Sequence, residues 1–267
     1  QIKELLTNYG DIAIFFWDNP TGMTEEYAKK INDLFKDYPH IITNDRLIRG
    51  SKKYTGDYKT PEQIIPTVKQ LDGTDWETNM TLNDSWGYKK RGCVWKTSET
   101  LILNLVDIVS KGGNYLLNIA PDGEGGIPEI NYHRLKEIGN WMKKYGESIY
   151  ETERVKTSQP MWGRCTQKIV GNKTYVYLHV IDWPEDQQLL FRLYEKAISA
   201  KLLHNGQTLK FKNTHDGIYI DLPKYAPDKY VSVIKVEFDK QLPRFKIRPM
   251  NQSNYEIVDA DKESQKK

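Results

Sequence analysis

A run of five apolar residues ends at an acidic residue near the start of the chain. Residues 13–17, Ala-Ile-Phe-Phe-Trp, show no helical period, and Asp18 follows them directly. Such a run is typical of a strand that is buried on both faces in a parallel sheet. In folds of that class the ends of the strands carry the chemistry. The run therefore predicts an α/β fold and makes Asp18 a candidate functional residue, although Asp-Asn-Pro is also a good turn sequence.

Strand and helix patterns alternate over the first 154 residues. Helical spacing of apolar residues predicts helices over 1–9, 24–38, from 97 to about 111 and around 132–145. Strands are expected at 13–18, 40–46, 74–81 and 114–120, and 55–67 is expected to be a loop. The sequence thus predicts an α/β region over residues 1–154.

The pattern changes to short alternating runs from about residue 156. Strands are expected at 173–180, 189–194, 200–203, 218–222 and 230–238, with hairpin signals such as Asn205-Gly206 and Asp216-Gly217 between some of them. We predict a small antiparallel β-sandwich over 155–245. The remaining residues, 246–267, are expected to form a partly disordered tail.

Charge and composition exclude several classes of partner. The net charge of +3 is too small to suggest nucleic acid, and no apolar stretch is long enough for a membrane helix. Cys93 and Cys165 lie far apart without metal-ligand spacing, and they are expected to be free or buried thiols. Neither a metal nor another cofactor is expected.

Polar side chains follow each of the four predicted α/β strands. Because parallel strands expose their carboxyl ends at one edge of a sheet, we expect these residues to converge on one site: Asp18, Asn44, Asp45, Arg46, Glu77, Asn79 and Asn118. The chain lacks a nucleophile elbow, a glycine-rich phosphate loop and a histidine pair at metal spacing. Carboxylates, an arginine and aromatic residues remain, and these are the groups that glycoside hydrolysis needs.

A series of motifs in the first 154 residues resembles, in order, the alpha-L-fucosidases of glycoside hydrolase family 29. The motifs lie at 5–10 with the strand ending at 18, 44–46, 56–57, 60–62, 76–77, 85–88, 105–114, 117–123 and 146–150. The β-rich remainder looks like the C-terminal sandwich of that family. The resemblance implies that residues 1–154 are the C-terminal portion of a (β/α) TIM-like barrel.

The resemblance also implies a retaining exo-glycosidase that removes terminal alpha-L-fucosyl residues through a covalent fucosyl-enzyme intermediate. It makes Asp18 the nucleophile, Arg46 a sugar-contacting residue and Trp86 the aromatic residue near the fucose methyl group. Phe16 stands where many members have tryptophan, so the wall of the pocket is expected to differ. The expected partner is a fucosylated glycan.

Two glutamates are candidates for the acid/base, since family members differ in which glutamate acts. Glu77 follows Trp76 near a strand end, where desolvation would raise its pKa and keep it protonated, and we prefer it. Glu62, in the Thr-Pro-Glu segment, is the alternative, and it could equally be a solvated loop acid.

Only about half of the eight strands of a barrel can be counted, so the N-terminal half of the barrel is expected to be missing from this chain. A non-catalytic fucose-binding or carbohydrate-binding fragment is therefore an alternative function. A hydrolase of another sugar, such as alpha-L-galactose, is a further one. The resemblance suggests a secreted, periplasmic or lysosomal protein.

Overall fold

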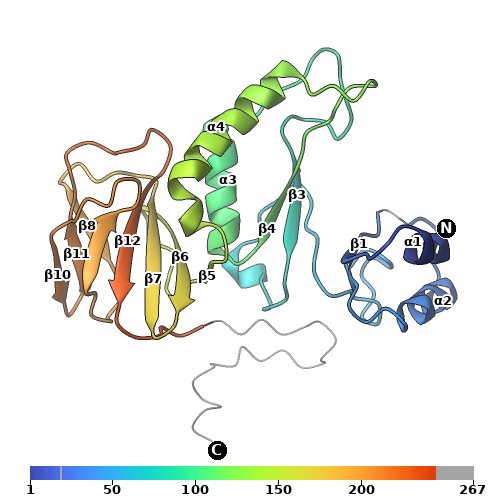
Figure 1. The fold of residues 1–267 in the computed structure, drawn as a ribbon, viewed down its shortest axis with the longest axis horizontal. Coiled ribbons are helices and arrows are strands. Elements are labelled where there is room, and N and C mark those ends of the chain that lie inside the picture. Colours follow the sequence, from blue (N-terminus) through green and yellow to red (C-terminus); the bar gives the residue numbers. More distant parts are fainter. Residues whose placement is uncertain (19, 245–267) are drawn as a thin grey trace, which may run out of the picture. The chain divides into compact units, whose positions relative to one another are not determined.

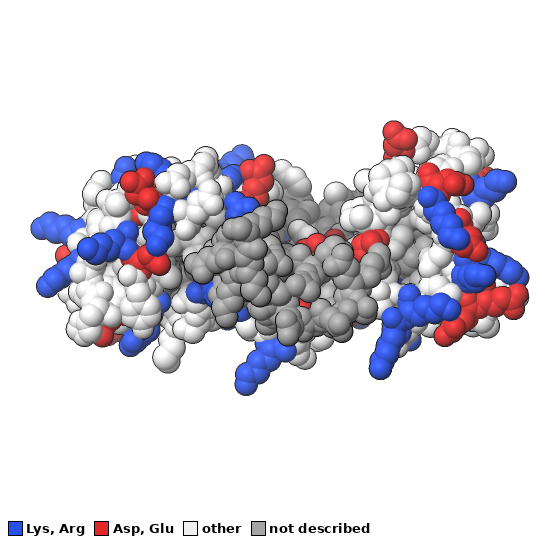
Figure 2. Space-filling model, turned by 90° about the horizontal axis from the view of Figure 1, so that it is seen from below, with Lys and Arg blue, Asp and Glu red and all other residues white. Residues whose placement is uncertain are grey.

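The computed structural model describes residues 1–18 and 20–244. The chain divides into two compact units, the first spanning Gln1–Asn79 and the second beginning at Met80. Figure 1 shows the elements of each unit, and Figure 2 shows that basic and acidic side chains both occur on the surface. The predicted tail at 246–267 lies outside the described residues.

The first unit is built from short helices and one parallel pair of strands. Helix α1 spans Ile2–Asn8, strand β1 Ile14–Phe15, helix α2 Glu25–Phe35, strand β2 Ile42–Thr43 and the 3-10 helix η1 Val68–Gln70. Strands β1 and β2 run parallel, with Ile14 opposite Ile42 and Phe15 opposite Thr43. Thr24 caps α2 by accepting a hydrogen bond from the Tyr27 amide. The predicted strand–helix–strand order is confirmed.

The prediction that the first strand is buried on both faces is wrong. Ile14 is 53% exposed, and among the described residues β1 pairs with β2 only. Phe15 and Trp17 of the apolar run pack with Phe35 of α2, with ring centroids 4.7–5.7 Å apart, whereas Phe16 contacts the Arg46 guanidinium. An uninterrupted apolar run satisfies a one-sided aromatic cluster as well as it satisfies a central strand, so the pattern alone does not distinguish them.

The predicted loop at 55–67 runs alongside the strands in an extended form. Isolated parallel bridges join Asn44 to Tyr58, Lys59 to Trp76 and Glu62 to Asn79. At its start, Gly56 has φ +66°, and a Cβ atom there would lie 2.2 Å from the carbonyl oxygen of Asn44. Only glycine fits this close approach of two backbones.

Strand β3 (Glu77–Thr81) leads into the second unit and forms a two-stranded sheet with β4 (Asn114–Asn118). Helix α3 (Ser98–Ser110) lies between them in sequence, and Thr97 caps it by accepting from the Thr100 amide. Helix α4 spans Glu129–Tyr145, and the 3-10 helix η2 follows at Gly146–Ser148. The helices predicted from residue 97 and around 132–145 are therefore confirmed.

Antiparallel strands form the rest of the second unit, as predicted. One sheet has three strands in the order β10-β11-β8, and the other has five in the order β5-β6-β7-β12-β9. A shared apolar core includes Leu189 and Phe191 from the smaller sheet and Val176 and Leu178 from the larger. The bounds are β5 Glu153–Arg154, β6 Gly163–Val170, β7 Lys173–Val180, β8 Gln188–Phe191, β9 Ser199–Leu202, β10 Phe211–Thr214, β11 Gly217–Asp221 and β12 Ser232–Phe238.

A second core joins helices α3 and α4 to the larger sheet, beside which they lie in Figure 1. It includes Ile102 and Val106 of α3, Trp141 of α4, and Tyr177 of β7. The Trp141 indole also donates a hydrogen bond of 2.9 Å to the carbonyl of Val231. The helices and the larger sheet therefore share one buried apolar core within the second unit.

Cys93 and Cys165 are free thiols, as predicted. No helix among the described residues is both long enough and apolar enough to span a bilayer.

Replacement of Gly163 by alanine should destabilise the second unit. A Cβ atom at this position of β6 would lie 1.9 Å from the carbonyl oxygen of His179, so β6 and β7 would have to separate. We expect a loss of about 2 kcal/mol in the free energy of unfolding, measured by urea titration. The matched control is Gly139→Ala in α4, where a Cβ meets nothing within 4 Å and helix propensity favours alanine. Equal stability of the two variants would contradict the packing described for β6 and β7.

Candidate active site

Arg46 is the centre of a cluster of charged residues in the first unit. Its side chain is only 7% exposed, and its Nη1 atom lies 3.6 Å from Oδ1 of Asp18 and 3.0 Å from Oε2 of Glu62. A buried guanidinium is stable only when carboxylates and hydrogen-bond acceptors surround it. The cation therefore brings together two carboxylates that are 44 positions apart in the sequence.

Thr60 fixes the direction of the Arg46 guanidinium. Nε of Arg46 donates to the hydroxyl of Thr60 at 2.8 Å, and Nη2 donates to its carbonyl at 3.1 Å. The Thr60 hydroxyl and amide both donate to Oδ1 of Asp45, at 2.7 and 3.1 Å. Phe16 covers the guanidinium at 5.3 Å from the ring centroid. With these bonds made, Nη1 is left to face the carboxylates.

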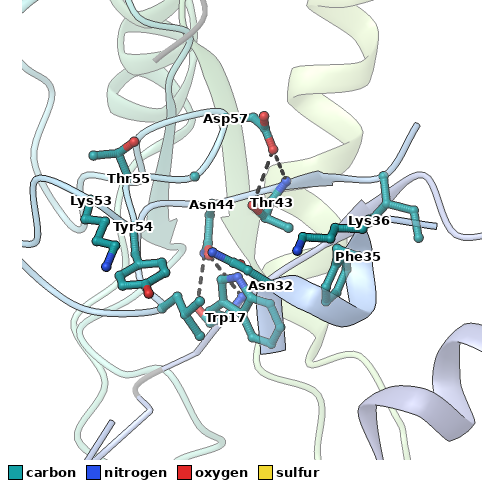
Figure 3. A pocket seen from close by; sticks show the side chains of 13 residues that line it. Trp17, Asn32, Phe35, Lys36, Thr43, Asn44, Lys53, Tyr54, Thr55 and Asp57 are labelled. Atoms are coloured by element: carbon teal, nitrogen blue, oxygen red, sulfur yellow. Dashed lines mark hydrogen bonds between the residues drawn. The ribbon is translucent and has the colours of Figure 1, made fainter. Parts of the chain in front are cut away.

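Asn44 fixes the residue that precedes Asp18. Its side-chain oxygen accepts from the Trp17 amide and its side-chain nitrogen donates to the Trp17 carbonyl, both at 3.0 Å. Figure 3 shows these two bonds beside a hollow of about 270 Å³ whose lining includes Tyr54 and Asp57. Asp18, Glu62 and Glu77 do not line this hollow, so it is distinct from the place where Arg46 contacts its carboxylates. The Asn44 side chain extends the pairing of β1 and β2 beyond the end of the sheet.

The separation of Asp18 and Glu62 has an upper limit. Both carboxylates contact the same nitrogen of Arg46, so the two contacting oxygens cannot be farther apart than the sum of 3.6 and 3.0 Å. In retaining glycosidases the two carboxyl groups lie about 5–5.5 Å apart, and in inverting ones about 6.5–9.5 Å. Asp18 is 72% exposed and Glu62 38% exposed, so both are open to solvent.

Glu77 is half-buried at the start of β3, and burial raises its pKa above the usual glutamate value, while Arg46 opposes this rise. Its amide donates to the carbonyl of Lys59 at 2.9 Å. The predicted direction of this pKa shift is confirmed. A carboxyl group that retains its proton toward neutral pH is suited to donate it.

Tyr58 belongs to the same cluster and was not predicted. Burial and the negative charges of Glu77 and Asp45 raise its pKa to about 12, so it keeps its phenolic proton. Its bridge to Asn44 places it there, but its position in an apparent loop gave no sequence signal. Asn79 also contributes through its backbone, since its amide donates to Pro61 and its carbonyl accepts from Gln63. These two bonds hold the chain on both sides of Glu62.

Trp86 and Asn118 belong to the second unit. The Trp86 side chain is exposed, and the Asn118 side chain donates to the Trp86 carbonyl at 2.8 Å. Of the predicted strand-end residues, the structure brings Asp18, Asp45, Arg46 and Glu77 together in the first unit, where the predicted loop residue Glu62 joins them, and it pairs Asn118 with the Trp86 loop in the second. Within residues 1–18 and 20–244, no group of three histidine, cysteine or acidic side chains could hold a metal ion.

Comparison with known proteins identifies the family. The family described as "Alpha-L-fucosidase" matches residues 1–147. The chain belongs to the alpha-L-fucosidase family. It is 32% identical to the plasma alpha-L-fucosidase of Homo sapiens over 244 residues, which cover 84% of this chain and 50% of that protein.

Solved structures of the same family resemble the fold of this chain. Alpha-L-fucosidase isoenzyme 1 from Paenibacillus thiaminolyticus has a TM-score of 0.77 and 34% identity, over 88% of this chain and 60% of that one. The Thermotoga maritima alpha-fucosidase in complex with a mechanism-based inhibitor has a TM-score of 0.65 and 29% identity, over 79% of this chain and 50% of that one. The chain spans about half the length of the curated relatives it matches.

The raised pKa of Glu77 makes a prediction for stability. A carboxyl group that binds its proton more tightly in the folded state favours folding most below its unfolded-state pKa of about 4.3, and this contribution is lost as the pH rises through the folded pKa. The Glu77→Gln variant has no ionisable group at this position, so it does not undergo this pH-dependent loss of stability. We therefore expect the stability of Glu77→Gln relative to the wild type to increase between about pH 4 and pH 7, measured by urea unfolding.

The control for this prediction is Arg46→Met. Arg46 lowers the pKa of Glu77, so its removal should raise that pKa further in a carbon-13 NMR titration of the glutamate carboxyl groups. A Glu77 pKa at or below the free glutamate value in the wild type would contradict the burial described here.

Proposed function

We propose that this chain carries the catalytic carboxylates of a retaining exo-alpha-L-fucosidase that acts on fucosylated glycans. In this proposal residues 1–154 are the C-terminal portion of a (β/α) barrel and residues 155–245 are its β-sandwich. Family membership supports the activity, and the human and bacterial relatives carry the name fucosidase. The Arg46 cluster supports the placement of the chemistry.

In the first step Asp18 attacks the anomeric carbon of the fucosyl group. The bond from that carbon to the glycosidic oxygen breaks, and Glu77 donates its proton to the departing oxygen. In the second step Glu77, now ionised, takes a proton from water, and that water displaces Asp18 from the anomeric carbon. The exposed Asp18 carboxylate is accessible to substrate, and partial burial raises the pKa of Glu77, which favours the protonated form that the first step requires.

Arg46 holds Asp18 in position as the anion that the first step requires. Its Nε and Nη2 atoms are occupied by Thr60, so it points at the nucleophile in one orientation before substrate arrives. Nη1 is also placed where it can bind a sugar hydroxyl between Asp18 and Glu62. Phe16 forms an apolar wall behind the guanidinium. Trp86 keeps the role that the family resemblance gives it, near the fucose methyl group.

One observation carries the proposal: a single buried arginine contacts Asp18 and Glu62 while a half-buried glutamate with a raised pKa belongs to the same cluster. It also supports Glu77 over Glu62 as the acid/base. Glu62 is engaged in a 3.0 Å ion pair with Arg46, which suits an anion that positions the arginine. Glu77 has no such contact among the described ion pairs, and burial favours its protonated form, which suits a proton donor.

Substitution of Asp18 should stop turnover and allow chemical rescue. Asp18→Gly in the full-length protein should lose hydrolysis of an aryl alpha-L-fucoside with a good leaving group, because no covalent intermediate can form. Added azide should restore cleavage and give the beta-fucosyl azide, since azide enters from the face that Asp18 occupied. Undiminished hydrolysis without azide, or an alpha-configured product, would exclude Asp18 as the nucleophile.

The acid/base can be identified by comparing Glu77→Ala with Glu62→Ala. Loss of the acid/base should lower kcat/KM by about 10²–10⁴-fold on a substrate with a poor leaving group and much less on one with a good leaving group. Azide should rescue the true acid/base variant and yield the alpha-fucosyl azide by attack on the covalent intermediate. We expect this behaviour for Glu77→Ala. If only Glu62→Ala shows it, the roles of the two glutamates are reversed.

A non-catalytic carbohydrate-binding function is the second candidate. The observation in its favour is that the Asp18 side chain is 72% exposed, since catalytic carboxylates act best when water is excluded. This function predicts that the chain binds L-fucose in calorimetry without hydrolysing an aryl fucoside. Hydrolysis that depends on Asp18 would exclude it.

A further inference from the structure

The loop at 83–95 is a compact structure closed at its base. The Lys96 amide donates to the Leu82 carbonyl at 2.9 Å, and the Lys96 ammonium donates to the carbonyls of Thr81 and Asn83. The Leu82 amide donates in turn to the Asn118 carbonyl at 3.1 Å. The loop therefore begins at the edge where β3 and β4 both end, and this edge is where α/β folds bind their ligands.

Internal bonds also order the tip of this loop. Oδ1 of Asp84 accepts from the Val94 amide at 3.3 Å, and Oδ2 of Asp84 pairs with the Lys89 ammonium at 3.1 Å. The side chain of Asn118 holds the carbonyl of Trp86 at 2.8 Å. The loop is thus cross-linked at three points, and the charge of Lys89 is already balanced by Asp84.

Two cations on the loop remain without a carboxylate partner. Lys90 and Arg91 are both exposed, and neither takes part in an ion pair within the described part of the chain. Adjacent exposed cations repel each other unless an anion binds between them. The ordered loop sets the position of their backbone, so two adjacent cations are available on the same loop as ligands for an anion.

The same loop lines a hollow of about 280 Å³ that is suited to a single sugar unit. Tyr88 and Trp95 provide aromatic surface, Lys90 and Arg91 provide charge that no ion pair balances among the described residues, and Ala120 and Pro128 also line the hollow. Every charged residue in the lining is a cation. Two acidic residues close in sequence to Ala120 and Pro128 have other contacts: Asp122 accepts from the amides of Glu124 and Gly126, and Glu129 contacts His133.

We propose that this hollow binds an anionic saccharide unit, one that carries a sulfate ester or a carboxylate. The aromatic rings contact the apolar face of the sugar, and the guanidinium of Arg91 and the ammonium of Lys90 bind the anionic oxygens. That the ligand is a saccharide rests on the proposed function, whereas its charge rests on the lining of the hollow. The substrate class is accordingly a fucosylated glycan that contains acidic sugars.

The proposal is tested by binding, which is independent of turnover. The full-length Asp18→Ala protein is titrated calorimetrically with a sulfated fucose oligosaccharide, with the same oligosaccharide after desulfation, and with an oligosaccharide that carries a uronic acid. We expect the acidic oligosaccharides to bind at least tenfold more tightly than the desulfated one. The double variant Lys90→Gln/Arg91→Gln should lose this difference, because each charge-assisted contact contributes a factor of about ten.

The matched control is Lys201→Gln/Lys212→Gln, which removes two exposed lysines from strands β9 and β10 and should leave binding unchanged. Inorganic sulfate and a single-stranded DNA oligomer test whether charge alone suffices. The proposal is overturned if the desulfated oligosaccharide binds equally well, if the control pair reduces binding as much as the loop pair, or if DNA binds as tightly as the sulfated sugar. Binding without turnover by the unsubstituted protein would instead reject the proposed hydrolase and leave this site standing.

Discussion

The contact of Arg46 with Thr60 is the interaction on which the candidate site depends. A buried guanidinium carries a large desolvation cost, and it is retained here because each of its three nitrogens contacts an oxygen acceptor. Asp45 determines the orientation of Thr60, Thr60 that of Arg46, and Arg46 that of the exposed carboxylates. Two of these residues come from the end of β2 and one from the extended segment that follows Gly56. The charge network therefore also holds that segment against the strands, where sheet hydrogen bonds are few.

Many of the helices and strands could be predicted from the sequence, because helix caps and the spacing of apolar residues are local features. Thr24 and Thr97 mark the starts of α2 and α3 as the capping rule expects. The exposure of Ile14 could not be predicted, since it depends on what covers each face of the strand and the apolar run does not encode that. Strand β6 was missed for a related reason: its buried Thr166 and Gln167 are polar, and the carbonyls of Ser148 and Pro243 that accept from them are brought close only by the fold.

The candidate residues show the same limit. Strand-end acids such as Asp18 and Glu77 can be found by their positions after apolar runs, and the direction of the Glu77 pKa shift follows from its place beside Trp76. The shared contact of Asp18 and Glu62 with Arg46 could not be predicted, because it depends on how an irregular segment folds back onto the strands. Tyr58 was overlooked for the same reason. Irregular backbone carries little periodic signal, yet here it supplies a large part of the chemistry.

The Asn44 side chain has a consequence for how such a site can change over time. Its carboxamide pairs with both backbone groups of Trp17, so it acts as a rung of the sheet that is not made of backbone. Backbone rungs tolerate almost any side chain, whereas this one requires a group with one donor and one acceptor at a fixed reach. The apolar residues of the first strand can therefore drift among similar residues, while the position that follows the second strand cannot. The position of Asp18 after the first strand therefore depends on Asn44, a residue that follows the neighbouring strand.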